Sequence, residues 1–111
     1  MQYESLASGG DIRSSHSVTV SKLFQPLIPR FLANRKQEIL AIAEAWNCKD
    51  FSTIEKLSHG MKGASGSYGF LGLMEIASAM ESAAKNHQAD NIESLIQKLR
   101  QYFDSLEVVY E

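Results

Sequence analysis

His59 and Lys62 lie three residues apart in the segment His59-Gly60-Met61-Lys62-Gly63, a spacing suited to nucleophilic chemistry. On a helix, residues three and four apart share a face, so Lys62 and Gly63 are both neighbours of His59. A neutral imidazole nitrogen is a good nucleophile near pH 7, and a phosphoryl group bound to it is anionic. The Lys62 ammonium would stabilise that charge, and Gly63 leaves space for a partner to approach. The pattern therefore favours phosphoryl transfer at an exposed histidine.

A helix through this segment would have one apolar face and one polar face. At about 100° per residue, the apolar face, which we expect in the core, holds Ile54, Leu57, Met61, Ala64, Ser65 and Tyr68. The opposite face holds Glu55, Lys56, His59, Lys62, Gly63 and Gly66. His59 lies near the middle of this polar face, so we expect its imidazole to be exposed to solvent.

Five of the seven glycines recur at every third position in this region: Gly60, Gly63, Gly66, Gly69 and Gly72. A glycine inside a helix costs about 0.5–1 kcal/mol relative to alanine, so a purely structural helix has little reason to contain several. The run lacks the proline of collagen and matches neither G-x-G-x-x-G nor the phosphate-binding loop G-x-x-x-x-G-K-[ST]. These glycines therefore require another explanation.

The segment from His59 to Ser65, followed by Tyr68-Gly69-Phe70, closely resembles the H-x-[LIM]-K-G-[AS]-[SA] signature of the histidine-containing phosphotransfer (HPt) family. The resemblance extends from about Val20 to Glu111. It implies a four-helix bundle with a short leading helix, no ATP site and no cofactor. It also implies a phosphocarrier rather than an enzyme, whose histidine relays phosphoryl groups between receiver domains of hybrid histidine kinases and response regulators.

The resemblance also assigns roles to individual residues. His59 matches the phosphorylated position, Lys62 the lysine that stabilises the phosphate, and Gly63 the small residue at the surface where the receiver docks. We expect Gly66 and Lys56 to belong to the same docking surface, and Lys85 is a weaker candidate for a second cation. Gly60 departs from the family, which usually has a larger residue after the histidine.

Helical spacing of apolar residues continues through most of the chain, and no strand pattern is evident. We expect a leading helix around 18–25, a long helix from Leu27, a helix from about 51 and another over 73–85. A last helix is expected to carry apolar positions through Leu106. Asp50 is predicted to cap the helix from 51, and Asp90 with Glu93 to cap the last one. The predicted fold is all-α, an antiparallel four-helix bundle over residues 18–111, with a flexible tail over 1–17.

Composition narrows the remaining classes of function. The chain has 111 residues, of which 44% are hydrophobic, and a formal charge of −2, which argues against binding to nucleic acid or an acidic membrane. The single cysteine, Cys48, and the absence of paired Cys/His spacing favour a reducing, cytoplasmic compartment and no metal site. We expect a monomer.

Other residues with reactive side chains have simpler interpretations, and one competing function remains. His16, His87 and Cys48 are interpreted as solvated or incidental, and Glu75 and Glu81 as parts of a solvated helix face. The competing function is a helical adaptor of HPt shape that binds partners without phosphotransfer. A self-sufficient hydrolase or transferase is disfavoured because Glu55 is the only acid or base at helical spacing from His59.

Overall fold

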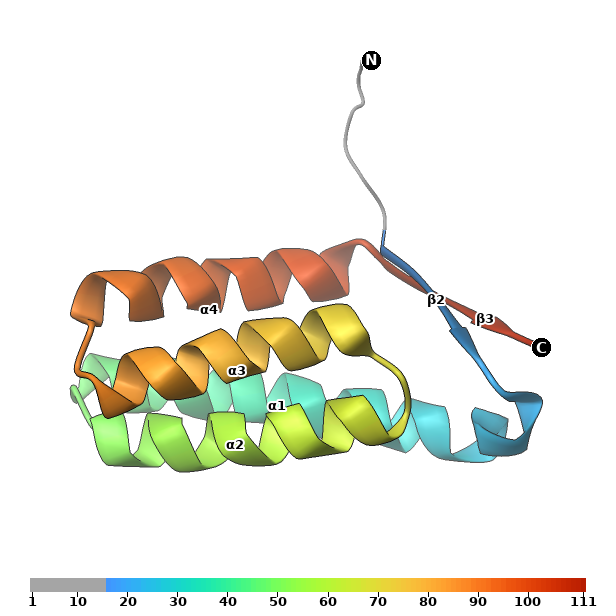
Figure 1. The fold of residues 1–111 in the computed structure, drawn as a ribbon, viewed down its shortest axis with the longest axis horizontal. Coiled ribbons are helices and arrows are strands. Elements are labelled where there is room, and N and C mark those ends of the chain that lie inside the picture. The colour runs from blue at the N-terminus through green and yellow to red at the C-terminus, as the bar shows by residue number, and fades with distance from the viewer. Residues whose placement is uncertain (1–15) are drawn as a thin grey trace, which may run out of the picture.

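The computed structural model describes residues 16–111, which form four long helices, one short 3₁₀ helix and two short strands. In chain order the elements are β2 (His16–Val20), the 3₁₀ helix η1 (Lys22–Leu27), α1 (Ile28–Asn47), α2 (Phe51–Ser67), α3 (Leu71–Lys85), α4 (Ala89–Asp104) and β3 (Leu106–Tyr110). Successive long helices run in opposite directions (Figure 1). The predicted helical bundle with a short leading helix is confirmed. The first fifteen residues of the expected tail lie outside the described part of the chain.

All four long helices contribute to one core. Helix α2 packs against α3 and α1, and α4 closes the bundle by packing against α3 and α1. The largest fully buried apolar side chains come from every long helix and from the segment after α2: Ile28, Ile42, Ile54, Met61, Phe70, Leu73, Met80, Ile92 and Leu99. Burial of these side chains is the main stabilising contribution, and His59 and Gly63 of α2 remain exposed.

The beginning of α2 follows the sequence prediction. Asp50 is the N-cap residue, and its carboxylate accepts hydrogen bonds from the Thr53 backbone N–H at 3.1 Å and from the Thr53 hydroxyl at 2.6 Å. These bonds lower the pKa of Asp50, the hydroxyl bond contributing most. The cap fixes where α2 starts, and therefore which of its residues face outward.

The beginning of α4 differs from the prediction. The helix starts at Ala89 with Gln88 as its N-cap, and Gln88 makes no side-chain capping bond. Asp90 is therefore inside the first turn rather than at the cap, and the predicted capping pair with Glu93 is wrong. A carboxylate in a first turn still stabilises the helix through its dipole, which accounts for the acidic signal at this position.

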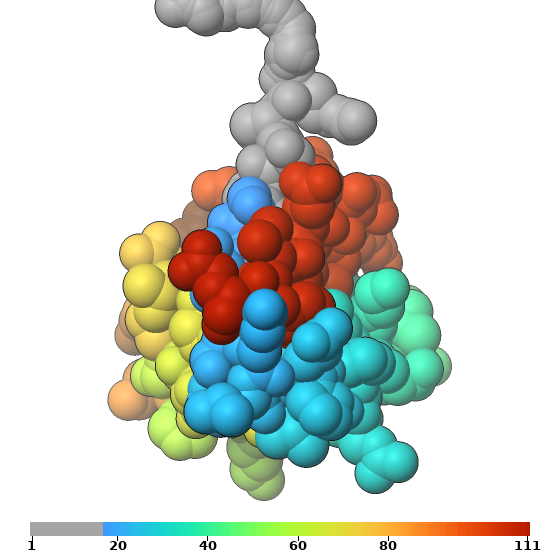
Figure 2. Space-filling model, turned by 90° about the vertical axis from the view of Figure 1, so that its right-hand side faces the viewer, coloured from blue at the N-terminus to red at the C-terminus, as the bar shows by residue number. Residues whose placement is uncertain are grey.

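The two strands correct the expectation that the chain has no β structure. β2 and β3 form a parallel pair in which His16 is aligned with Leu106 and Val20 with Tyr110. Val20 is buried, and Val18 and Val108 pack against the core. Figure 2 shows the two strands side by side across one end of the molecule. The leading helix consequently begins at Lys22 rather than near Val18, and Leu106 belongs to a strand rather than to the last helix.

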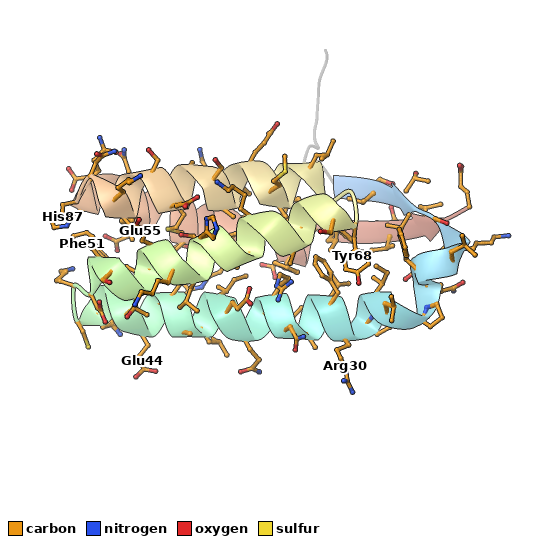
Figure 3. The ribbon with its side chains drawn as sticks, turned by 60° about the horizontal axis from the view of Figure 1, so that its bottom comes forward. Arg30, Glu44, Phe51, Glu55, Tyr68 and His87 are labelled. Carbon is orange, nitrogen blue, oxygen red and sulfur yellow. The ribbon has the colours of Figure 1, made fainter. Side chains whose placement is uncertain are left out.

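At the opposite end of the bundle, an aromatic contact joins the connection after α3 to the first residue of α2. His87 follows α3 with a positive φ of 54°, and its ring stacks on Phe51 at the start of α2, with centroids 4.5 Å apart and planes at 10°. Figure 3 shows the two rings together at this end. His87 is exposed, as expected, but it also links the α3–α4 connection to α2. Among residues 16–111, no helix is long and apolar enough to cross a membrane.

Candidate functional site

His59, Lys62 and Glu81 form a hydrogen-bonded cluster on the surface where α2 packs against α3. His59 Nδ1 lies 2.8 Å from Glu81 Oε2, and Lys62 Nζ lies 2.7 Å from Glu81 Oε1. The His59 side chain is 70% exposed, whereas Glu81 is 21% exposed. One carboxylate of α3 therefore holds both polar residues of α2 while the imidazole faces solvent.

The charge of Glu81 decides which nitrogen of His59 is available for chemistry. The hydrogen bond from Lys62, and then that from His59, hold the pKa of Glu81 below its ordinary value, despite the opposing effect of partial burial. An ionised carboxylate only accepts hydrogen bonds, so the proton of the neutral imidazole must be on Nδ1. Nε2 then carries the free lone pair. The cluster therefore selects the tautomer in which Nε2 is the nucleophile.

Two of the five regularly spaced glycines lie beside His59 with open space around them. A Cβ built on Gly60 or Gly63 meets no atom within 4 Å, apart from the local helix backbone and chain neighbours. The Gly63 carbonyl accepts a hydrogen bond from the Ser67 hydroxyl at 3.0 Å. Packing therefore gives no reason for glycine at either position, as the sequence argument had anticipated.

The other three glycines have structural explanations that the sequence did not reveal. A Cβ on Gly66 would lie 3.0 Å from Met74 Sδ, and one on Gly72 would lie 3.0 Å from Tyr102 Cε2. Gly69 has a φ of +84°, which favours glycine in the turn between α2 and α3. Gly66, assigned to the docking surface from the sequence, is thus also a close-packing position between α2 and α3.

The remaining predicted residues lie apart from the cluster. Lys56 is exposed on α2, one turn before His59, and its charge helps to lower the pKa of Asp50. Lys85 is exposed in the last turn of α3 and makes no hydrogen bond or ion pair within residues 16–111. Across the same residues, no group of three or more His, Cys, Asp and Glu side chains is placed to hold a metal ion.

Glu81 is the residue of the cluster that the sequence analysis did not identify, having been interpreted as part of a solvated helix face. The available signal was weak, because Glu81 is 22 residues from His59 and belongs to another helix. Only the pairing of α2 with α3, and the rotation of each helix about its axis, bring the two side chains together. The carboxylate that contacts His59 is thus Glu81 of the neighbouring helix α3. Glu55, the acid at helical spacing on α2 itself, makes no ion pair with any described residue.

The family comparison agrees with this geometry. The family model of the Hpt domain matches residues 27–108, most of the chain, including α1, α2, α3, α4 and the beginning of β3. No curated protein and no solved structure matches significantly. Membership in this family implies phosphotransfer in phosphorelays, in which Hpt domains act as phosphocarriers. The protein belongs to the Hpt domain family.

Proposed function

We propose that His59 accepts a phosphoryl group from the phospho-aspartate of one receiver domain and passes it to the aspartate of another. The observation that carries the proposal is the exposed imidazole, whose Nδ1 is held by Glu81 and whose Nε2 is free. The acceptor aspartate, and the Mg²⁺ that assists phosphoryl transfer, belong to the receiver in this proposal. The protein itself is a carrier without a nucleotide site or cofactor.

In the forward step, the Nε2 lone pair attacks the phosphorus of the aspartyl phosphate. The Nε2–P bond forms, the bond from phosphorus to the aspartate oxygen breaks, and the electron pair leaves with the carboxylate. The Nδ1 proton stays on the ring throughout, hydrogen-bonded to Glu81. In the reverse direction, Nε2 then departs as a neutral imidazole rather than as an anion, which makes it a better leaving group.

Glu81 acts in this scheme as a positioning residue. It fixes the tautomer and the orientation of the ring by accepting the hydrogen bond from Nδ1. It also restrains Lys62, which is 36% exposed and hydrogen-bonded at 2.7 Å in the unphosphorylated protein. Once phosphate is bound, the Lys62 ammonium is close enough along the helix to interact with it, and this interaction stabilises the anionic product.

The decisive experiment follows radiolabelled phosphate from a panel of phosphorylated receiver domains to this protein. We expect an acid-labile label on the parent protein and none on His59→Gln, while His87→Gln is labelled like the parent. Because the His59 side chain is exposed, His59→Gln should melt within about 2 °C of the parent. Labelling of His59→Gln at the parent level would refute the assignment.

The same experiment distinguishes the carrier from an adaptor of the same shape. An adaptor would bind receivers without taking up label, and its binding would not depend on His59. As further parts of the proposal, we place the protein in the cytoplasm as a monomer. These expectations are consistent with one exposed, unpaired cysteine, Cys48, in the described structure.

A further inference from the structure

A groove between α1 and α2 has the dimensions of a small-molecule site. Its volume is about 500 Å³, and small-molecule sites typically measure about 300–1,000 Å³. Its walls include Leu27 at the end of η1, residues of the first turns of α1, and Ala64 and Tyr68 from the end of α2. In Figure 3, Tyr68 lies between the two helices and Arg30 extends outward from α1.

The groove is separate from the His59 cluster. Ala64 and Tyr68 follow His59 by five and nine residues. At 3.6 residues per turn, they lie about 140° and 180° around α2 from His59. A molecule bound in the groove would therefore leave the imidazole exposed on the other side of the helix.

A buried arginine on α1 contributes to the wall of the groove. Arg35 is only 8% exposed, and its guanidinium carbon lies 4.9 Å from the centroid of the Phe31 ring. Its Nε and Nη2 donate to the Glu38 carboxylate at 2.8 and 2.9 Å, which fixes the orientation of the guanidinium. Nη1 makes no hydrogen bond with any described residue. Because Arg35 lines the groove, its remaining donors are available to a molecule that enters it.

A second arginine lies at the rim of the groove. Arg30 is exposed in the first turn of α1, and it makes no ion pair with any residue from 16 to 111. The N-terminal end of a helix carries a partial positive charge, so a cation in the first turn is unfavourable there. No acidic residue of that turn offsets the charge. Helix stability therefore gives no reason for an arginine at this position, whereas an anion in the groove would.

The charges and the walls together define the kind of molecule that fits. Arg35 and Glu38 cancel each other, so Arg30 leaves the groove with one net positive charge. The other walls are apolar or aromatic, and the Tyr68 ring is held by edge contacts with Phe24 and Phe31 at centroid distances of 5.2 and 5.1 Å. A planar carboxylate carries one negative charge and matches the hydrogen-bonding geometry of arginine. The complement of this groove is therefore a monoanion with an apolar body.

We propose that the groove between α1 and α2 binds a small organic carboxylate. The carboxylate accepts hydrogen bonds from Arg30 and Arg35, and the apolar body of the ligand lies against Phe31 and Tyr68. This site is additional to the proposed phosphoryl transfer and does not depend on it, since the groove and His59 are on opposite sides of α2.

A titration with two matched probes tests the proposal. The first probe is 2-naphthoate, and the second is 2-naphthamide, which has almost the same shape but no charge. Binding is followed by the backbone amide signals of the ¹⁵N-labelled protein. The variants are Arg30→Gln and Arg35→Gln. Lys36→Gln is the matched control, because Lys36 is also an exposed cation of α1 but does not line the groove.

We expect 2-naphthoate to bind the parent with a Kd of about 1 mM or lower and to shift signals of α1 and of the end of α2. The amide should bind at least about tenfold more weakly, and Arg30→Gln and Arg35→Gln should each weaken naphthoate binding at least about fivefold. Lys36→Gln should bind like the parent.

Equal affinity for the acid and the amide, or for the parent and Arg30→Gln, would overturn the inference. Signal shifts confined to other parts of the molecule would do the same. Should Arg35→Gln melt early, Arg30→Gln still decides the question, because Arg30 is exposed. His59→Gln should bind 2-naphthoate like the parent, so the result is independent of whether His59 accepts phosphate.

Discussion

Replacing Gly63 separates a requirement for folding from a requirement for partner access. An added Cβ meets no atom within 4 Å at this position, and the residue is exposed inside α2. Gly63→Ala should therefore stabilise the protein by about 0.5–1 kcal/mol, from helix propensity alone. For a domain of this size that corresponds to a rise in Tm of about 2–4 °C. Gly63→Gln should also melt at or above the parent temperature, because glutamine is a better helix former than glycine.

Partner binding should respond differently to the same two changes. The glutamine side chain would occupy the space beside His59 that a receiver needs, so we expect receiver binding to weaken about tenfold to hundredfold, or about 1.4–2.8 kcal/mol. Gly63→Ala should weaken it less. Thermal melting followed by circular dichroism, with titration calorimetry against one receiver, measures both properties on the same samples. A Gly63→Gln protein that melts early, or that binds as tightly as the parent, would refute the access argument.

The remaining predictions concern the cluster and the core. Lys62→Ala should slow transfer from a receiver about tenfold, equivalent to about 1.4 kcal/mol, while Lys98→Ala on α4 leaves the rate unchanged; equal rates would show that Lys62 is only a surface residue. Because the pKa of Glu81 is lowered in the folded state, its contribution to stability is present above the ordinary glutamate pKa and lost as pH falls through the lowered value. Denaturant unfolding should therefore show Glu81→Gln less stable than the parent at pH 7 and equal to it at strongly acidic pH, with Glu75→Gln, an exposed neighbour on α3, close to the parent throughout. The Ser65 hydroxyl is buried and has no hydrogen-bond partner among the described residues, whereas Ser58 donates to the Ile54 carbonyl at 2.6 Å. Ser65→Ala should accordingly raise the free energy of unfolding by about 1 kcal/mol. Ser58→Ala removes a hydrogen bond, so its effect on the free energy of unfolding should be less favourable. A loss of stability on Ser65→Ala would contradict this reasoning.

The parts of the fold that depend on local pattern could be predicted from the sequence. Helix α2 is an example, because its apolar stripe, its Asp50 cap and its polar face are all properties of one continuous segment. The same applies to the exposure of His59, which follows from its angular position on that helix. The Asp90 prediction failed because an acidic residue stabilises either a cap or a first turn, and the pattern does not distinguish them.

Features that depend on pairing distant segments were not predictable in this way. β2 and β3 have only five residues each, and each strand gains its hydrogen bonds from a partner about 90 positions away. Glu81 has the same difficulty at the site, since its role depends on how α3 is rotated against α2. The glycine run depends both on local sequence pattern and on contacts between distant segments. Its period of three suggested one common cause, but Gly63 faces open space, Gly66 packs against Met74 and Gly69 allows a turn.

The parallel pairing of β2 with β3 also determines how the domain responds to mechanical load. The strands run in the same direction, so the chain enters the pair beside Leu106 and leaves it beyond Tyr110, at the other end. A force that pulls the two ends of the described chain apart acts along the strands. It loads their hydrogen bonds together, in shear, instead of opening them one at a time. The strand pair therefore resists extension before the helices, and with them the α2–α3 contact that holds His59 against Glu81, bear the force.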